Sequence, residues 1–239
     1  LALVPARKGS KGLPCKNSRL LNGRPLLAWP VKAARASSYV DEVILSTDSE
    51  EYADIGREFG ARVPFIRPAD LALDTAPSID FILHAIAEME ALGETFDYLV
   101  LLEPTSPLTE AGDIDAALEK LEKNRPDADA LVGVAAMETT HPAYAVRLGK
   151  ADLITPLMSD GFDTLPRRQD LDPLFCLDGS LYISTPEALR TKRGFCHSRT
   201  LGFVMPRYKS LEVDDFVDFI CIEAIAGKLD EIARETSDN

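Results

Sequence analysis

Short runs of Val, Ile and Leu alternate with longer amphipathic stretches along the first 135 residues of the chain. The short runs predict strands at 1–4, 43–46, 62–66, 98–102 and 130–135. The longer stretches predict helices at about 26–37, from about 49 onward, at 78–92 and at 113–124. A strand covered on both faces is apolar throughout, and a helical crossover returns the next strand parallel to it. The alternation therefore predicts an α/β fold with a mostly parallel central sheet flanked by helices.

The second half of the chain departs from this pattern. From about 141 to 207, short segments such as YAVRL and SLYIS lie between many loop residues. We expect this region to form a smaller excursion from the sheet that carries substrate contacts and an oligomer interface. A last amphipathic helix is predicted from about 214 to 234. Because no repeat, low-complexity stretch or linker divides the 239 residues, we expect a single domain, 1–239.

The charges of the chain are unevenly distributed. The formal net charge is -13, yet residues 1–40 contain eight Lys and Arg and no Asp or Glu. The rest of the chain therefore carries 18 basic and 39 acidic side chains. An acidic protein of this kind disfavours nucleic acid and anionic membranes as partners, because both attract basic surfaces. The basic amino-terminal segment keeps a local positive field.

Targeting and cysteine patterns indicate the compartment. The sequence contains no run of about 18 apolar residues, and its first residues, LALVPARKGS, do not read as a signal peptide. Its four cysteines are scattered and lack the spacing of a zinc site. We expect a cytoplasmic protein with reduced thiols and without a disulfide framework or structural metal.

The segment PARKGSKGLPCKN, residues 5–17, follows the first predicted strand. Glycines at 9 and 12 allow the backbone to approach a phosphate closely, and Arg7, Lys11 and Lys16 supply charge-assisted hydrogen bonds. The segment is neither a GxxxxGK[ST] loop nor a GxGxxG loop. It predicts an anion-binding loop, and residues 103–108, which follow another strand, can share its crevice at the carboxyl edge of the sheet.

Six further segments accompany this loop in a fixed order. They are STDS at 46–49, RPADLALDTA at 67–76, LLEPTSPL at 101–108, RRQDL at 167–171, DGSLYIS at 178–184 and KSLEVDDFVDF at 209–219. Together the seven segments resemble the acylneuraminate (CMP-sialic acid) cytidylyltransferase family. The resemblance implies a Rossmann-like nucleotidyltransferase fold. It also implies transfer of CMP from CTP to the anomeric hydroxyl of a nine-carbon 2-keto-3-deoxy sugar acid, with release of pyrophosphate.

The resemblance assigns the nucleotide to residues of the first loop and its neighbours. CTP would be held by Arg7, Ser10, Lys11, Lys16, Asn17, Arg67 and Ser78. Ser78 also starts a predicted helix, so capping of that helix is an alternative role for it. Catalysis would rest on positioning and charge neutralisation by Arg7, Lys11, Lys16 and Asp214, and no protein general base is assigned.

A magnesium site is predicted in the segment LEVDD. Glu212 and Asp214 are two residues apart, so on an extended strand both carboxylates would face one side. Magnesium prefers hard oxygen ligands and commonly takes one or two carboxylates together with phosphates and waters. The family usually has two aspartates at these positions, which makes Asp214 the firmer ligand. Asp215 and Asp218 are interpreted as acids at a helix amino terminus.

The resemblance places the sugar near Glu103, Arg168, Gln169 and Asp178. The guanidinium of Arg168 would bind the sugar carboxylate in a bidentate manner, a role that the adjacent Arg167 could exchange with it. Three departures from the family leave the sugar open. Glu103 replaces a usual glutamine, Cys176 a frequent arginine, and Asp178 a common asparagine. Sialic, legionaminic and pseudaminic acids all remain candidates.

Other functions remain as alternatives. The nearest is a 3-deoxy-manno-octulosonate cytidylyltransferase, whose loop and second block read differently. A non-catalytic nucleotide-binding domain is disfavoured by the presence of Lys11, Lys16 and Asp214 together. A sugar-1-phosphate nucleotidyltransferase would require a different glycine-rich loop. The resemblance further implies a homodimer in which part of 141–207 reaches the partner's site.

Overall fold

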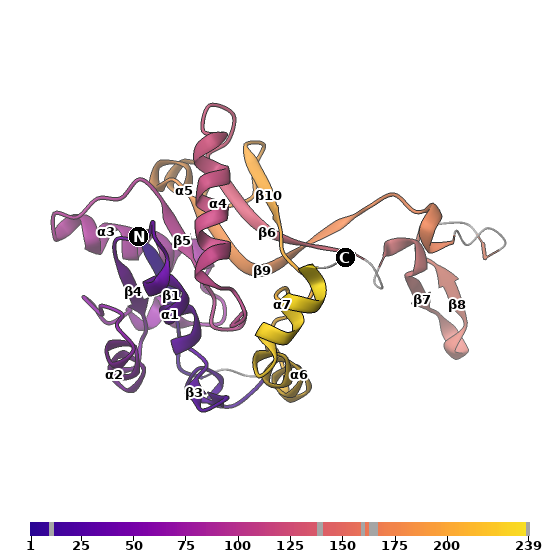
Figure 1. Ribbon diagram of the computed structural model, residues 1–239, viewed down its shortest axis with the longest axis horizontal. Coiled ribbons are helices and arrows are strands. Elements are labelled where there is room, and N and C mark those ends of the chain that lie inside the picture. The colour runs from indigo at the N-terminus through magenta and orange to yellow at the C-terminus, as the bar shows by residue number, and fades with distance from the viewer. Residues whose placement is uncertain (10–11, 138–140, 159–160, 163–166, 238–239) are drawn as a thin grey trace.

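The computed structural model describes the chain except residues 10–11, 138–140, 159–160, 163–166 and 238–239, and gives only the backbone of 168, 236 and 237. Its central sheet has six strands in the order β10-β6-β9-β5-β1-β4 (Figure 1). These are β1 Ala2–Pro5, β4 Val43–Ser46, β5 Leu99–Leu101, β6 Ala130–Ala136, β9 Phe175–Ser184 and β10 Thr200–Val204. β1 is parallel to β4 and β5, and β10 is parallel to β6. Only β9 runs antiparallel to its neighbours, so the predicted mostly parallel sheet is confirmed.

Helices cover both faces of the sheet, and the strand residues alternate between them. Ala2 and Val4 join a core cluster with residues of helices α1 and α4, whereas Leu3 joins a second cluster with residues of α3 and α5. Burial on both faces explains why the strands read as continuous apolar runs. The helices are α1 Ala28–Ala36, α2 Glu50–Glu58, α3 Ser78–Ala91, α4 Ala111–Lys123, α5 Pro186–Lys192, α6 Phe216–Ala226 and α7 Leu229–Ser237.

Short elements complete the fold. Five 3₁₀ turns occur among the described residues: η1 Lys16–Ser18, η2 Ala69–Ala72, η3 Pro142–Tyr144, η4 Lys150–Asp152 and η5 Arg168–Asp170. Two small hairpins pair β2 Leu20–Leu21 with β3 Arg24–Pro25, and β7 Val146–Leu148 with β8 Ile154–Pro156. Within the described part of the chain, no helix combines the length and the apolar character needed to cross a membrane.

Asp215 and Asp218 lie at the amino terminus of α6, as the sequence predicted. Asp215 Oδ1 accepts hydrogen bonds from the backbone N–H groups of Val217 and Asp218 at 2.7 and 3.1 Å. The Asp218 carboxylate accepts in return from the N–H of Asp215, which makes a reciprocal capping box. These two acids therefore act at the helix terminus, as the sequence indicated.

Three expectations about local structure were wrong. Residues 62–66 form no strand, because Pro64 lacks a donor N–H and only a single bridge joins Ile44 to Arg62. The last helix is divided into α6 and α7, since Gly227 ends α6 and glycine disfavours helix interiors. The segment 211–213 is not part of a strand.

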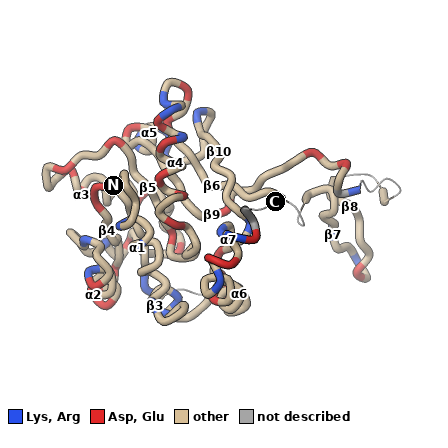
Figure 2. Tube along the Cα trace, viewed as in Figure 1, with Lys and Arg blue, Asp and Glu red and all other residues tan. Residues whose placement is uncertain are grey.

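The region 141–207 proves to have two parts. Its carboxyl-terminal part, with β9, α5 and β10, belongs to the body of the molecule. The hairpin of β7 and β8 instead projects as an arm, well separated from the sheet (Figure 1). The arm exposes large apolar side chains: Leu148 is 72% exposed, and Leu153 and Met158 are each 70% exposed. Figure 2 shows few charged positions along the two strands of the arm.

Candidate active site

A cavity of about 480 Å³ opens at the carboxyl ends of β1 and β5, where parallel-sheet proteins commonly bind ligands. It collects side chains from the loop after β1, the segment after β4, the start of α3, the end of β5 and the turn before α6. Seven of the predicted site residues line it: Arg7, Lys16, Asn17, Arg67, Ser78, Glu103 and Asp214. The structure thus brings together residues that are up to about two hundred positions apart in the chain.

The loop after β1 is bound to the turn before α6. Lys16 Nζ donates a hydrogen bond to the carbonyl oxygen of Val213 at 2.8 Å. Gly12 lies so close to the carbonyl oxygen of Asp214 that an added Cβ would collide with it. Within the loop, Asn17 Nδ2 donates to the carbonyl oxygen of Arg7 at 3.0 Å. Glycine at 12 is therefore required by close packing.

Lys16 is a partly desolvated cation. Burial lowers its pKa, while the carboxylates of Asp214 and Glu103 act in the opposite direction. Lys16 lines the cavity together with Glu103 and Asp214. A cation in this environment interacts strongly with a phosphate, because less water screens the charges.

Arg67 is the most buried cation of the cavity, at 3% exposure. Its Nε donates to Ser46 Oγ at 2.9 Å, its Nη2 donates to the carbonyl oxygen of Ser46 at 2.6 Å, and its guanidinium carbon lies 4.3 Å from the ring centroid of Phe81. Burial lowers its pKa to about 10. Among the described residues it forms no ion pair, so an anion in the cavity would offset a charge that the fold has desolvated.

Arg7 is held by a residue of the second block. It forms an ion pair with Asp74 and also donates from Nη1 to the carbonyl oxygen of Ala72 at 3.3 Å. Asp74 lines the same cavity. A phosphate that binds Arg7 therefore competes with this carboxylate.

Ser78 does not cap α3. It occupies the first helical position, the residue before it is Pro77, and no side-chain capping bond is formed there. Ser78 instead lines two neighbouring cavities. One is the cavity of about 480 Å³ at the carboxyl ends of β1 and β5, called the phosphate-side cavity, and the other adjoins it. The capping alternative for Ser78 is therefore wrong.

Of the carboxylates predicted for metal and sugar, Glu103 and Asp214 line the cavity and Glu212 and Asp178 do not. Asp214 lines it, but the Glu212 carboxylate packs against Gly179 of β9, where an added Cβ would collide with it. Residues 211–213 form no strand, so the strand geometry expected for the two carboxylates is not present. Burial raises the pKa of Glu212 to about 7, with further contributions from Glu103, Asp214 and Asp178.

Asp178 lies beneath the site. It is 4% exposed, and its Oδ1 accepts from the N–H and hydroxyl of Ser180 at 3.0 and 2.6 Å. Its Oδ2 has no hydrogen-bond partner among the described residues. Burial raises its pKa. Asp178 does not line the cavity.

Magnesium fits this arrangement through Asp214. The described residues contain no cluster of three or more His, Cys, Asp or Glu side chains that could hold a metal by themselves. Magnesium does not require such a cluster, since one carboxylate with phosphates and waters can complete its shell. Asp214 is an exposed carboxylate on the cavity wall and satisfies that requirement, whereas Glu212 faces Gly179.

Several predicted residues are not placed at the cavity. Ser10, Lys11 and the side chain of Arg168 lie outside the described residues. Gln169 is on η5, which precedes β9 in the projecting part of the chain, and it does not line the cavity. The neighbouring Arg167 pairs with Asp170 at 2.8 Å.

A second cavity of about 390 Å³ adjoins the first and shares Ser78 and Glu103 with it. The sequence did not predict this cavity, and Tyr182 and Phe195 in its wall also pack against a core cluster. Their rings lie 5.3 Å apart, and burial raises the pKa of Tyr182. The strand pairing of Leu101 with Tyr182 creates this juxtaposition, and no local pattern signals it.

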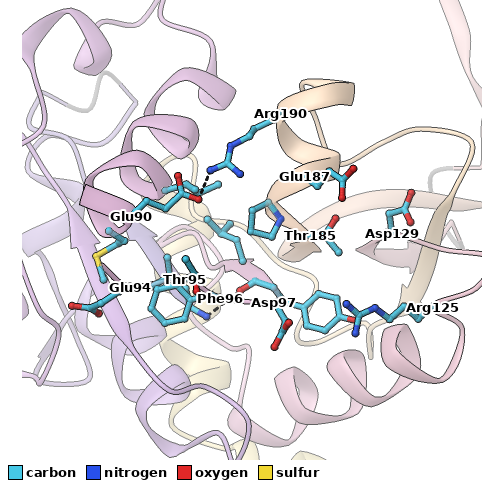
Figure 3. Close-up of a pocket in the computed structure, with 16 residues that line it drawn as sticks. Glu90, Glu94, Thr95, Phe96, Asp97, Arg125, Asp129, Thr185, Glu187 and Arg190 are labelled. Atoms are coloured by element: carbon cyan, nitrogen blue, oxygen red, sulfur yellow. Dashed lines mark hydrogen bonds and ion pairs between the residues drawn. The ribbon is translucent and has the colours of Figure 1, made fainter. Parts of the chain in front are cut away.

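A further cavity, of about 450 Å³, lies at the opposite end of the sheet and is shown in Figure 3. Its wall includes the ion pair between Glu90 and Arg190, at 2.6 Å, together with Phe96 and Asp97. None of the predicted site residues lines it, and it is beside the amino ends of β1 and β5. The phosphate-side cavity is therefore the candidate active site.

Known proteins resemble this chain over most of its length. The sequence profile of a family described as cytidylyltransferase matches residues 1–153. A CMP-N,N'-diacetyllegionaminic acid synthase from Legionella pneumophila is 32% identical over 98% of this chain and 97% of its own length. A pseudaminic acid cytidylyltransferase from Campylobacter jejuni is 30% identical over 91% of this chain and 92% of its own.

Two other comparisons concern chain length and fold. An N-acylneuraminate cytidylyltransferase from Streptococcus agalactiae is 35% identical over 92% of this chain, which spans 51% of that relative. A solved CMP:2-keto-3-deoxy-manno-octonic acid synthetase complexed with CTP has a TM-score of 0.68 at 17% identity, covering 95% of this chain and 98% of its own. That structure shares the fold. With the profile match and the three relatives, these findings show that the chain belongs to the cytidylyltransferase family.

Proposed function

We propose that the chain transfers CMP from CTP to the anomeric hydroxyl of a nine-carbon 2-keto-3-deoxy sugar acid and releases pyrophosphate. The observation that carries the proposal is a cavity with desolvated cations, Lys16 and Arg67, and a carboxylate, Asp214, in one wall. Relatives covering more than nine-tenths of the chain are named for CMP-legionaminic, pseudaminic and N-acylneuraminic acid formation.

In the proposed reaction, the anomeric oxygen forms a bond to the α-phosphorus of CTP, and the bond from that phosphorus to the β-phosphate oxygen breaks. The hydroxyl proton leaves to solvent or to the released pyrophosphate. Lys16, Arg67 and Arg7 would bind the triphosphate and offset charge on the leaving group. Arg7 would exchange Asp74 for phosphate. Ser10, Lys11 and Asn17 belong to the same loop and complete the proposed nucleotide site.

Magnesium is part of the proposal, with Asp214 as its protein ligand. When bound, the ion would neutralise charge on the phosphates. Glu212, which packs against Gly179, is the second proposed ligand.

A homodimer and a cytoplasmic location also belong to the proposal. The exposed apolar side chains of the β7–β8 arm support an interface, because contiguous exposed apolar patches mark association sites. Gln169 does not line this chain's own cavity, and Arg168 precedes it on the same turn, η5. We propose that they serve the sugar site of the second copy.

The cytoplasmic location is proposed because CTP, the nucleotide substrate, is available in the cytoplasm.

The test is a product assay with a panel of sugars. The purified chain, CTP and magnesium are mixed with N-acetylneuraminate, legionaminic acid, pseudaminic acid or 3-deoxy-manno-octulosonate, and pyrophosphate and CMP-sugar are measured. CMP-sugar from a nine-carbon acid supports the proposal. Product from the eight-carbon acid alone would establish the octulosonate alternative, and CTP binding without product from any sugar would indicate a non-catalytic domain.

Matched arginine variants test the cavity itself. Arg7→Ala is expected to abolish turnover while the fold is retained. Arg57→Ala, on exposed α2 and paired with Asp54, should leave turnover unchanged. Near-normal turnover of Arg7→Ala would exclude this loop as the triphosphate site.

A further inference from the structure

Glu103 stands between two cavities. It follows β5 and lines both the phosphate-side cavity and the adjoining cavity of about 390 Å³. Ser78 is the other residue common to both walls. A substrate whose reacting oxygen approaches the triphosphate therefore extends past Glu103 when it enters the adjoining cavity. This position gives Glu103 a direct influence on what the second cavity accepts.

The adjoining cavity is mainly apolar. Its wall contains Ile79, Ile82, Leu101 and Phe195. Arg193 is the cation in this wall, and its Nη2 lies 2.5 Å from the Asp80 carboxylate. Since that arginine is already paired, the carboxylate of Glu103 is the charge that the wall offers to a ligand.

The surroundings of Glu103 do not neutralise it fully. The positive charge of Lys16 stabilises the Glu103 carboxylate. The Lys16 ammonium group, however, also donates to the carbonyl oxygen of Val213, and Lys16 lines the phosphate-side cavity. Asp214 adds a like charge, and Glu212 and Glu103 repel one another. Burial is the largest cause of the raised pKa of Glu103. A partly buried carboxylate in such a field is stabilised by any cation that a ligand brings.

These observations distinguish among ligand groups. A carboxylate of the sugar would be repelled by Glu103 and must point elsewhere. A neutral amide N–H could donate one hydrogen bond but would leave the charge uncompensated. A protonated amine or amidine would supply both the donor and the opposite charge, and charge-assisted hydrogen bonds are about twice as strong as neutral ones.

We infer that Glu103 selects sugar acids that carry a basic nitrogen substituent, an amine or an amidine, on a part of the sugar remote from its carboxylate. The adjoining cavity holds the carbon atoms attached to that nitrogen, against Ile79, Ile82 and Phe195. This inference rests on the proposed function and specifies the substrate class of the same site. It involves binding alone and adds no chemical step.

The experiment compares isosteric substrates and isosteric side chains. Two pairs of substrates are compared. Each pair consists of a sugar with acetamido groups, N-acetylneuraminate or legionaminic acid, and the analogue of that sugar in which an acetamidino group replaces one acetamido group. The ratio of kcat/KM for the amidine over kcat/KM for the amide is measured in the wild type and in Glu103→Gln. The ratio should exceed one in the wild type and fall by about 10- to 100-fold in the variant. Glu58→Gln, an exposed carboxylate on α2, should retain the wild-type ratio.

The outcomes separate this inference from the proposed function. Wild-type CMP-sugar formation with an amidine-to-amide ratio at or below one for every pair refutes the inference and leaves the function standing. An unchanged ratio in Glu103→Gln also refutes it. If the wild type forms no CMP-sugar from any nine-carbon acid, the proposed function fails and the inference fails with it. The wild-type ratio provides the test even if Glu103→Gln does not fold.

Discussion

Replacing Glu212 with glutamine is expected to stabilise the protein at pH 8 and to change its stability little at pH 5. The Glu212 carboxyl group packs against Gly179. Burial is the largest cause of its raised pKa, and Glu103, Asp214 and Asp178 add like charges. Glutamine has nearly the same shape and carries no charge, so it removes the electrostatic cost without opening a cavity.

The sign and size follow from proton linkage. The pKa of Glu212 rises from 4.5 to about 7 on folding, so the folded state binds more protons than the unfolded state between these values. The free energy of unfolding of the wild type therefore falls as pH rises through this window. The full difference corresponds to about 3 kcal/mol at most. Because Glu212 is partly exposed, solvent screening reduces the expected effect to about 1–2 kcal/mol.

The assay is urea unfolding at pH values from 5 to 8.5 in magnesium-free buffer with a chelator, comparing the wild type with Glu212→Gln. The variant should gain about 1–2 kcal/mol relative to the wild type as pH increases. Contributions from Glu103 and Asp178, whose pKa values are also raised, are present in both proteins and largely cancel. Glu58→Gln is the control and should show no such gain. A stability difference that does not depend on pH would refute the reasoning.

Three further predictions concern the loop, its close packing and the arm. Lys16→Met should lower kcat/KM for CTP by about 100-fold or more in steady-state kinetics. Lys8 is exposed, and Lys8→Met should change kcat/KM by less than about twofold. Equal kcat/KM values for the two variants would contradict this prediction. Gly12→Ala should cost about 1–3 kcal/mol of stability and weaken CTP binding in calorimetry, because its methyl group meets a backbone oxygen. Gly112→Ala has open space and should do neither. Leu148→Glu should dissociate the proposed dimer in light scattering, and a monomeric wild type would exclude that dimer.

Most of the sheet could be predicted because its signals are local. The apolar runs at β1, β4, β5 and β6 are short and uninterrupted, and helical periodicity between them identifies the crossovers. Where the prediction was wrong, a single residue had been underweighted. Pro64 removes a ladder donor from an apolar run, and Gly227 ends an apparently continuous helix.

The candidate site was predictable in composition and not in geometry. The segments after β1 and β5 were expected to share a crevice, since the carboxyl ends of parallel strands lie together, and residues of both line one cavity. The sequence did not reveal that Asp74 pairs with Arg7. The strand expected for LEVDD was wrong, because residues 211–213 form no strand and Glu212 packs against Gly179.

Residue types and spacing by themselves indicated the α/β class, predicted an anion-binding loop after the first strand, and carried the resemblance that led to the family. Tertiary structure alone decided how charges are compensated and which cavities adjoin. The pKa of Glu212 depends on Glu103, Asp178 and Asp214, which come from different segments of the chain. Glu103 lies between an anion site and an apolar cavity only because β9 pairs with β5 and brings Tyr182 opposite Leu101. Such effects depend on distance and burial in space, which nearby residues in the sequence do not specify.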